Sequence, residues 1–99
     1  MKDYSKMSDF EINKAVATAL GMDVSGATEE NNIMYGYVPD ICSNPSDAMP
    51  ILIENRISLT WVNGECRASS VKAGYHEFSC SNAMRAAMIV YLMMKDEDK

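Results

Sequence analysis

The residues able to do chemistry in this 99-residue chain are few and widely separated. The one histidine, His76, has no neighbouring serine or cysteine in the strand–turn–helix setting of an activated nucleophile. A catalytic base needs such a partner within hydrogen-bond reach. The sequence therefore favours an ordinary strand histidine and predicts no catalytic residue.

The three cysteines, Cys42, Cys66 and Cys80, are odd in number and far apart, with no C-x-x-C pair. His76 and Cys80 are four residues apart, so a Cys/Cys/His/Cys metal site is conceivable. Structural zinc usually takes its ligands from two tight pairs, and only one such pair exists here. We therefore expect free thiols, mostly buried, with no metal and no cofactor.

Three carboxylates, Asp40, Asp47 and Glu54, precede or lie within one predicted helix. They lack the spacing of a calcium loop. Asp47 near a helix start is better explained as a partner of the positive end of the helix dipole.

Arg85 lies in the first turn of a strongly apolar predicted helix, so its guanidinium must reach water or a carboxylate. One interpretation is a structural ion pair with Asp40 or Asp47. The alternative is an anchor for a ligand. The residues considered as candidate interaction sites are Asp47, Asn55, Trp61, Asn82, Arg85 and Met88.

Three helices are predicted to position these side chains, over residues 8–20, 46–55 and 82–94. The first begins with a capping box, because Ser8 is followed three residues later by Glu11. The second contains Pro50, which predicts either a start close to that residue or a kink there. In the third, Asn82 is the expected cap.

A hairpin is predicted over about 57–71, because Asn63-Gly64 suits a two-residue turn. That turn sets Trp61 opposite Cys66 and Leu59 opposite Ala68, which leaves one face largely apolar. A third strand is expected over 75–79, a short strand over 33–38, and a loop over 22–32.

Only Arg85 is charged between residues 83 and 94, so this helix is apolar nearly all round. Such a helix is either central to the fold or covered by a partner. We expect it to carry the core and to leave some apolar surface, including Met88, for a homodimer contact. The nine methionines suit core filling or an adaptable binding surface.

Together these elements predict one α+β domain over residues 1–99, with a small antiparallel sheet and helices packed on one face. Residues 1–6 and 95–99 are expected to fray. The net charge of −5 makes direct nucleic-acid binding unfavourable. The N-terminus carries no apolar signal segment, and the longest apolar run, 86–94, is too short to span a membrane.

Several segments in this order resemble the NinX-like family of small proteins from lambdoid phages and enterobacterial prophages. They are YSKMSDFEIN at 4–13, NPSDAMPI at 44–51, ENRISL at 54–59 and NAMRAAMIVYL at 82–92. The family often has Asn-Pro where this chain has Asn82-Ala83. Proline is favourable at the first position of a helix but can be replaced there. The resemblance implies a phage accessory protein in a bacterial cytoplasm, and it implies no activity and no catalytic residues.

The function expected from these observations is stoichiometric binding to a host or phage protein, without catalysis. Two alternatives stay open. An acidic mimic of nucleic acid needs dense carboxylates, and only Glu29-Glu30 and residues 96–98 cluster. A binder of a nucleotide or other small ligand would use the surroundings of Arg85.

Overall fold

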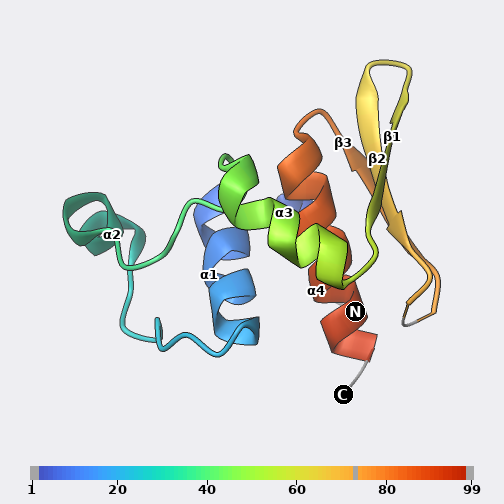
Figure 1. Ribbon diagram of the computed structural model, residues 1–99. Coiled ribbons are helices and arrows are strands. Elements are labelled where there is room, and N and C mark those ends of the chain that lie inside the picture. The colour runs from blue at the N-terminus through green and yellow to red at the C-terminus, as the bar shows by residue number, and fades with distance from the viewer. Residues whose placement is uncertain (1–2, 73, 98–99) are drawn as a thin grey trace.

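The computed structural model describes residues 3–72 and 74–97. Within these ranges it describes the side chains of all residues except 33–35 and 97. Helices and a three-stranded sheet follow one another as in Figure 1. The elements are a 3-10 turn η1 (Tyr4–Lys6), α1 (Asp9–Ala19), α2 (Glu29–Tyr35), α3 (Pro45–Glu54), β1 (Ser58–Val62), β2 (Glu65–Ser70), β3 (His76–Cys80) and α4 (Ala83–Glu97). The α+β class is confirmed.

The sheet is antiparallel with strand order β1-β2-β3. Trp61 is opposite Cys66 and Leu59 is opposite Ala68, as the turn predicted. Both turn residues have positive φ, +53° at Asn63 and +83° at Gly64, which matches the twist of the flanking strands. Cys66 and Ala68 on the covered face are fully buried.

Helix α4 is the centre of the fold, since it contacts all three strands as well as α1 and α3. In Figure 1 the sheet lies on one side of α4 and α1 on the other, while α3 crosses in front of α4. Residues 86–90 are 0% exposed. The prediction that this helix carries the core is confirmed. The expectation that it leaves Met88 exposed for a dimer contact is wrong, because neighbouring elements cover it on all sides.

Helix α1 begins as predicted. The Ser8 hydroxyl accepts from the Glu11 N–H (3.2 Å), and the Glu11 carboxylate accepts from the Ser8 N–H (3.0 Å). Helix α3 begins at Pro45 behind the Asn44 cap and contains Pro50. The predicted range of 46–55 is confirmed to within one residue at each end, and the alternative of a start close to Pro50 is excluded. Proline at the first helical position loses no bond, and packing of Leu52 in the core stabilises the helix beyond Pro50.

The predicted strand over 33–38 is wrong, as is a loop for all of 22–32, because α2 covers Glu29–Tyr35. Thr28 and Asn31 form a reciprocal capping box, with hydrogen bonds of 3.2 and 2.8 Å. Gly36 ends this helix in the left-handed conformation, at φ +64°. The helix projects away from the main body, beside a small apolar cluster (Ala17, Val24, Ala27, Val38).

Fraying was predicted for residues 1–6 and 95–99, and it stays a prediction, although the structure places residues 4–6 in η1 and 95–97 in α4. Tyr4 is buried, and its hydroxyl donates to the Asp96 carboxylate, which ties η1 to the last turn of α4. The Lys95 ammonium lies 5.5 Å from the centre of the Tyr91 ring. Residues 1–2 and 98–99 lie outside the described residues.

Among the helices described, none has the length and apolar character to cross a lipid bilayer.

Candidate functional site

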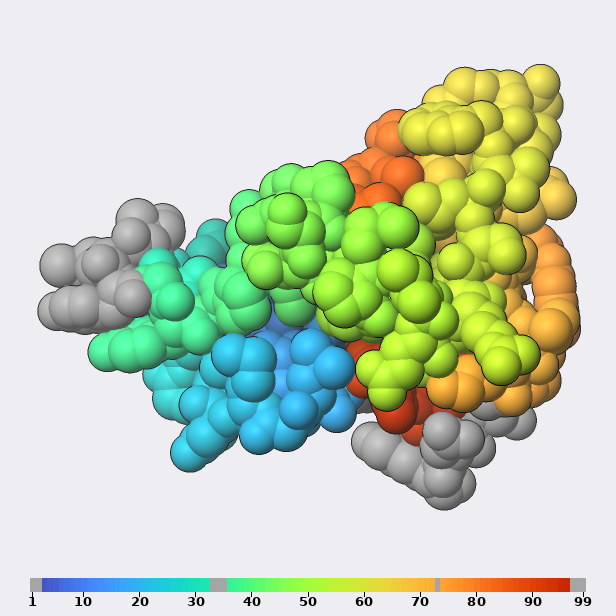
Figure 2. Space-filling model, in the orientation of Figure 1, coloured from blue at the N-terminus to red at the C-terminus, as the bar shows by residue number. Residues whose placement is uncertain are grey.

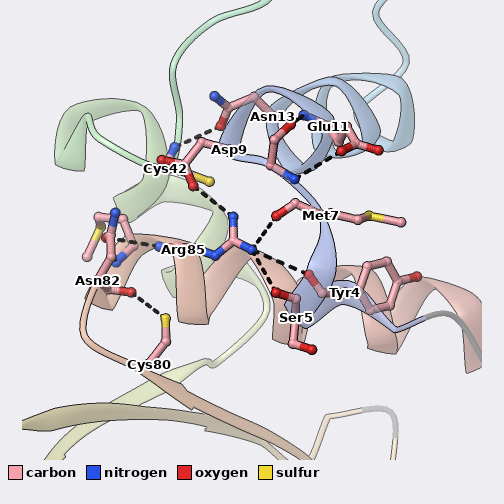
Figure 3. Close-up of polar contacts among 12 residues, drawn as sticks. Tyr4, Ser5, Met7, Asp9, Glu11, Asn13, Cys42, Cys80, Asn82 and Arg85 are labelled. Atoms are coloured by element: carbon pink, nitrogen blue, oxygen red, sulfur yellow. Dashed lines mark hydrogen bonds and ion pairs between the residues drawn. The ribbon is translucent and has the colours of Figure 1, made fainter.

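The surroundings of Arg85 begin with the start of α4. The Asn82 side-chain oxygen accepts from the N–H groups of Met84 (3.0 Å) and Arg85 (3.2 Å), so Asn82 is the predicted cap. The Cys80 thiol donates to the Asn82 carbonyl (3.1 Å). The end of β3 and the start of α4 are thereby fixed together, which aims the Arg85 side chain toward η1 and α1 (Figure 3).

The Arg85 guanidinium joins three parts of the chain. Its Nη1 donates to the Asp9 carboxylate at 2.7 Å, in the first turn of α1. Its Nη2 donates to the carbonyls of Tyr4 (3.4 Å), Ser5 (3.5 Å) and Met7. These carbonyls lie between η1 and the start of α1, where a cation interacts favourably with backbone acceptors; the Tyr4 carbonyl also accepts from the Met7 N–H (3.2 Å).

The predicted ion pair therefore exists, but its partner is Asp9 and not Asp40 or Asp47. Asp40 instead accepts from the Asn13 side chain (3.0 Å), while the Asn13 oxygen accepts from the Cys42 N–H (2.9 Å). Asp47 is exposed in the first turn of α3, in the dipole position that the sequence predicted. The Arg85 side chain is 16% exposed, and both of its terminal nitrogens are occupied by protein acceptors.

The other candidate residues do not gather around Arg85. Asn55 ends α3, where its side chain donates to the Ile51 carbonyl (2.9 Å) and its own carbonyl accepts from the Ser70 hydroxyl (2.9 Å). Trp61 is 64% exposed near the end of the β1–β2 hairpin. Met88 is inside the core. The structure thus brings together Asn82 and Arg85 and separates them from the remaining candidates.

A cavity of about 450 Å³ lies between α1 and the C-terminal half of α4, a volume in the range of small-molecule sites. Arg85 does not line it. Its lining residues are Tyr4, Ala15, Thr18, Ala19, Leu92, Lys95 and Asp96. Burial raises the pKa of Tyr4, and the hydrogen bond to Asp96 raises it further.

Metal ligands do not converge in the part of the chain that the structure describes, where no group of three His, Cys, Asp or Glu residues is placed to hold an ion. His76 is buried on β3 and has at least one interaction partner. The three cysteines are free. Cys66 and Cys42 are fully buried, whereas Cys80 is half-buried at the end of β3.

The buried thiols give a first prediction. Burial, together with a smaller effect of the Asp9 carboxylate, raises the pKa of Cys42 from 9.0 to about 12. Burial also raises the pKa of Cys66. Because thiolates are the reactive form, a disulfide reagent at about pH 8 is expected to spare Cys42 and Cys66 in the folded protein and to modify all three in denaturant. Rapid modification of Cys42 without denaturant, assigned with Cys42→Ala, would contradict this arrangement.

The same shift has a consequence for stability. A thiol whose folded-state pKa lies above the ordinary value favours folding while it is protonated. That contribution is complete below about pH 9 and is lost as the pH rises toward 12. We therefore expect the free energy of unfolding to decrease over this alkaline range, and to decrease less in Cys42→Ala.

Sequence reasoning missed the exposed apolar residues of α3, Met49 and Ile53, which are 42% and 72% exposed. Their spacing of four residues places them side by side on one helix face. The sequence contains this spacing. It does not show which face of a short, apolar helix the rest of the protein covers.

The fold and the Arg85 network define a small α+β protein whose main polar cluster fastens its N-terminal segment to its central helix. The chain belongs to the family described as Bacteriophage P22, NinX, whose family model matches residues 3–95. The resemblance seen in the sequence is thereby confirmed. No curated protein and no solved structure matches the chain.

Proposed function

We propose that this phage accessory protein is a non-catalytic module that binds another protein stoichiometrically in the bacterial cytoplasm. Membership of the NinX family supports the phage context. The observation that carries the binding proposal is an apolar stripe on the solvent side of α3, composed of Met49, Pro50 and Ile53 and called here the α3 stripe.

The α3 stripe lies on a helix whose opposite face is already used. Ala48, Ile51 and Leu52 are buried in the core, so α3 is apolar on both sides. Figure 2 shows α3, in green, at the surface of the molecule. Leaving Ile53 72% exposed forgoes the favourable burial of a large aliphatic side chain. Such surfaces on small proteins commonly mark contacts with partners.

The chemistry of the partner follows from the rim of the α3 stripe. Asp47 and Glu54 are exposed carboxylates on the same helix. A helix that presents anchors at i and i+4 fits an apolar groove, and carboxylates at its edges favour basic side chains around that groove. Methionine and isoleucine fill such a groove without requiring hydrogen-bond partners.

The test is capture from phage-infected cells with the full chain as bait, followed by native mass spectrometry of the complex. The parent is expected to retain one partner protein in a fixed ratio. A double variant, Met49→Ser with Ile53→Ser, is expected to lose about tenfold or more of the captured partner, since apolar anchors dominate such contacts. Both positions are exposed, so the free energy of unfolding should change by only about 0.5 kcal/mol.

The matched control is Val71→Ser, which removes an apolar side chain that is 75% exposed elsewhere on the surface. Equal capture by the α3 double variant would overturn the proposal. A complex that forms independently of the α3 stripe and dissociates on adding salt would favour the nucleic-acid mimic. A nucleotide that raises the melting temperature would favour a small-ligand binder.

A further inference from the structure

Strand β1 forms one edge of the sheet, and no described strand pairs with its outer side. Its sequence, SLTWV, contains neither a charge nor a proline. Soluble proteins usually place charged residues or proline on an open edge strand, which prevents pairing with other chains. The other edge strand, β3, contains the charged Glu77. The β1–β2 hairpin also projects beyond the helices (Figure 1), which leaves Trp61 64% exposed. The β1 edge is therefore accessible to another strand.

Two charged residues flank this edge. Arg56 precedes β1 and Glu65 follows the turn after it, and both are exposed. Neither takes part in an ion pair with another described residue. They carry opposite charges, one at each end of β1.

Arg56 has an unfavourable backbone conformation, with φ at +55°. It follows the last turn of α3, where its N–H donates to the Ile53 carbonyl (3.3 Å) and the N–H of Ile57 donates to the Leu52 carbonyl (2.9 Å). Glycine is the usual residue at this position of a helix end. The Arg56 side chain is exposed and forms no ion pair with another described residue, so its guanidinium is available to a partner.

We propose that two copies of this chain pair their β1 strands edge to edge, antiparallel about a two-fold axis at Thr60, to form a continuous six-stranded sheet. This register pairs all five residues of the strand. Ser58 lies opposite Val62 of the second copy, and Leu59 lies opposite Trp61 of the second copy. Directly opposed side chains share a face, so each Trp61 ring covers the half-buried Leu59 of the other copy.

The charges at the two ends favour a second copy over a strand of another protein. In this register Arg56 of one copy lies beside the turn of the other, close to Glu65 of the second copy. The two-fold axis repeats this pairing at the opposite end. Like charges do not meet along β1, because the strand has none. The surface is thus complementary to itself, in spite of a net charge of −5 on each chain.

The test is sedimentation equilibrium of the full purified chain over a range of concentrations. The parent is expected to form a dimer. Trp61→Lys and Arg56→Glu are each expected to weaken the dimer about tenfold or more, because the first loses an apolar contact and the second places two acidic residues together. The double exchange Arg56→Glu with Glu65→Arg is expected to restore it. Circular dichroism establishes that each variant folds.

The control is Tyr75→Lys, at a position 61% exposed and outside β1, which should leave the dimer unchanged. A parent that remains a monomer at every concentration would overturn the proposal. This holds even if Trp61 then proves necessary for binding another protein. A dimer that withstands Trp61→Lys, or that the double exchange fails to restore, would show a different interface. The α3 double variant should still dimerise, so this result is independent of the proposed function.

Discussion

Replacing Ala87 with aspartate is expected to abolish folding. Ala87 is 0% exposed in the middle of α4, the helix that packs against the sheet, α1 and α3. A carboxylate there is buried without a partner and also exceeds the space available. The cost is several kcal/mol, comparable with the whole stability of about 5–15 kcal/mol for a small domain. Circular dichroism recorded on heating should show no cooperative thermal transition.

Ala83→Asp is the matched control, since it places the same substitution on the same helix. Ala83 is half-buried at the first position of α4, where a carboxylate interacts favourably with the helix dipole. Its melting transition should stay close to that of the parent. If Ala87→Asp also melted cooperatively near the parent temperature, the central position of α4 would be refuted.

Replacing Arg85 with methionine is expected to lower the free energy of unfolding by about 2–4 kcal/mol, and the melting temperature by roughly 10 °C or more. The substitution keeps most of the apolar stem. It removes the ion pair with Asp9 and the hydrogen bonds to three backbone carbonyls between η1 and α1. Since the Arg85 side chain is only 16% exposed and its contacts with the Tyr4 and Met7 carbonyls are partly buried, the loss exceeds that of a surface ion pair. Urea unfolding measures it directly.

The comparison is Arg67→Met, which breaks the ion pair with Glu77 on the open face of the sheet. That pair is longer, at 3.6 Å, and both side chains are 47% exposed. Its loss should cost only about 0–1 kcal/mol. Equal effects of the two substitutions would mean that the Arg85 contacts contribute little, and would reopen the interpretation of Arg85 as a ligand anchor.

The sequence alone was sufficient for the elements whose signals are local. The Ser8–Glu11 capping box placed the start of α1, and Asn63-Gly64 set the hairpin register. Each of these depends on atoms within a few residues of one another, so the backbone chemistry determines the outcome. The extreme apolar character of residues 83–94 likewise predicted a central helix, because no surface position tolerates apolar groups on every side.

Local signals were misread where two of them competed. The aromatic and β-branched residues of 33–38 favoured a strand, whereas Thr28 and Gly36 mark the limits of a helix. The helix formed because both of its ends are satisfied, by a capping box at the start and a left-handed glycine at the end. The capping box has Asn31 where glutamate is usual, so the sequence indicated the start of this helix only weakly.

Only the tertiary structure decided which distant groups meet. Arg85 pairs with Asp9, 76 positions away in the chain, and the Tyr4 hydroxyl reaches Asp96 across 92 positions. No spacing rule selects Asp9 over Asp40 or Asp47, because all three were available and the choice depends on how α1 crosses α4. The same packing buried Met88 and exposed Ile53, although both are apolar helix residues. Composition fixes how much apolar surface a chain has, whereas the arrangement of its elements determines which part remains in contact with water.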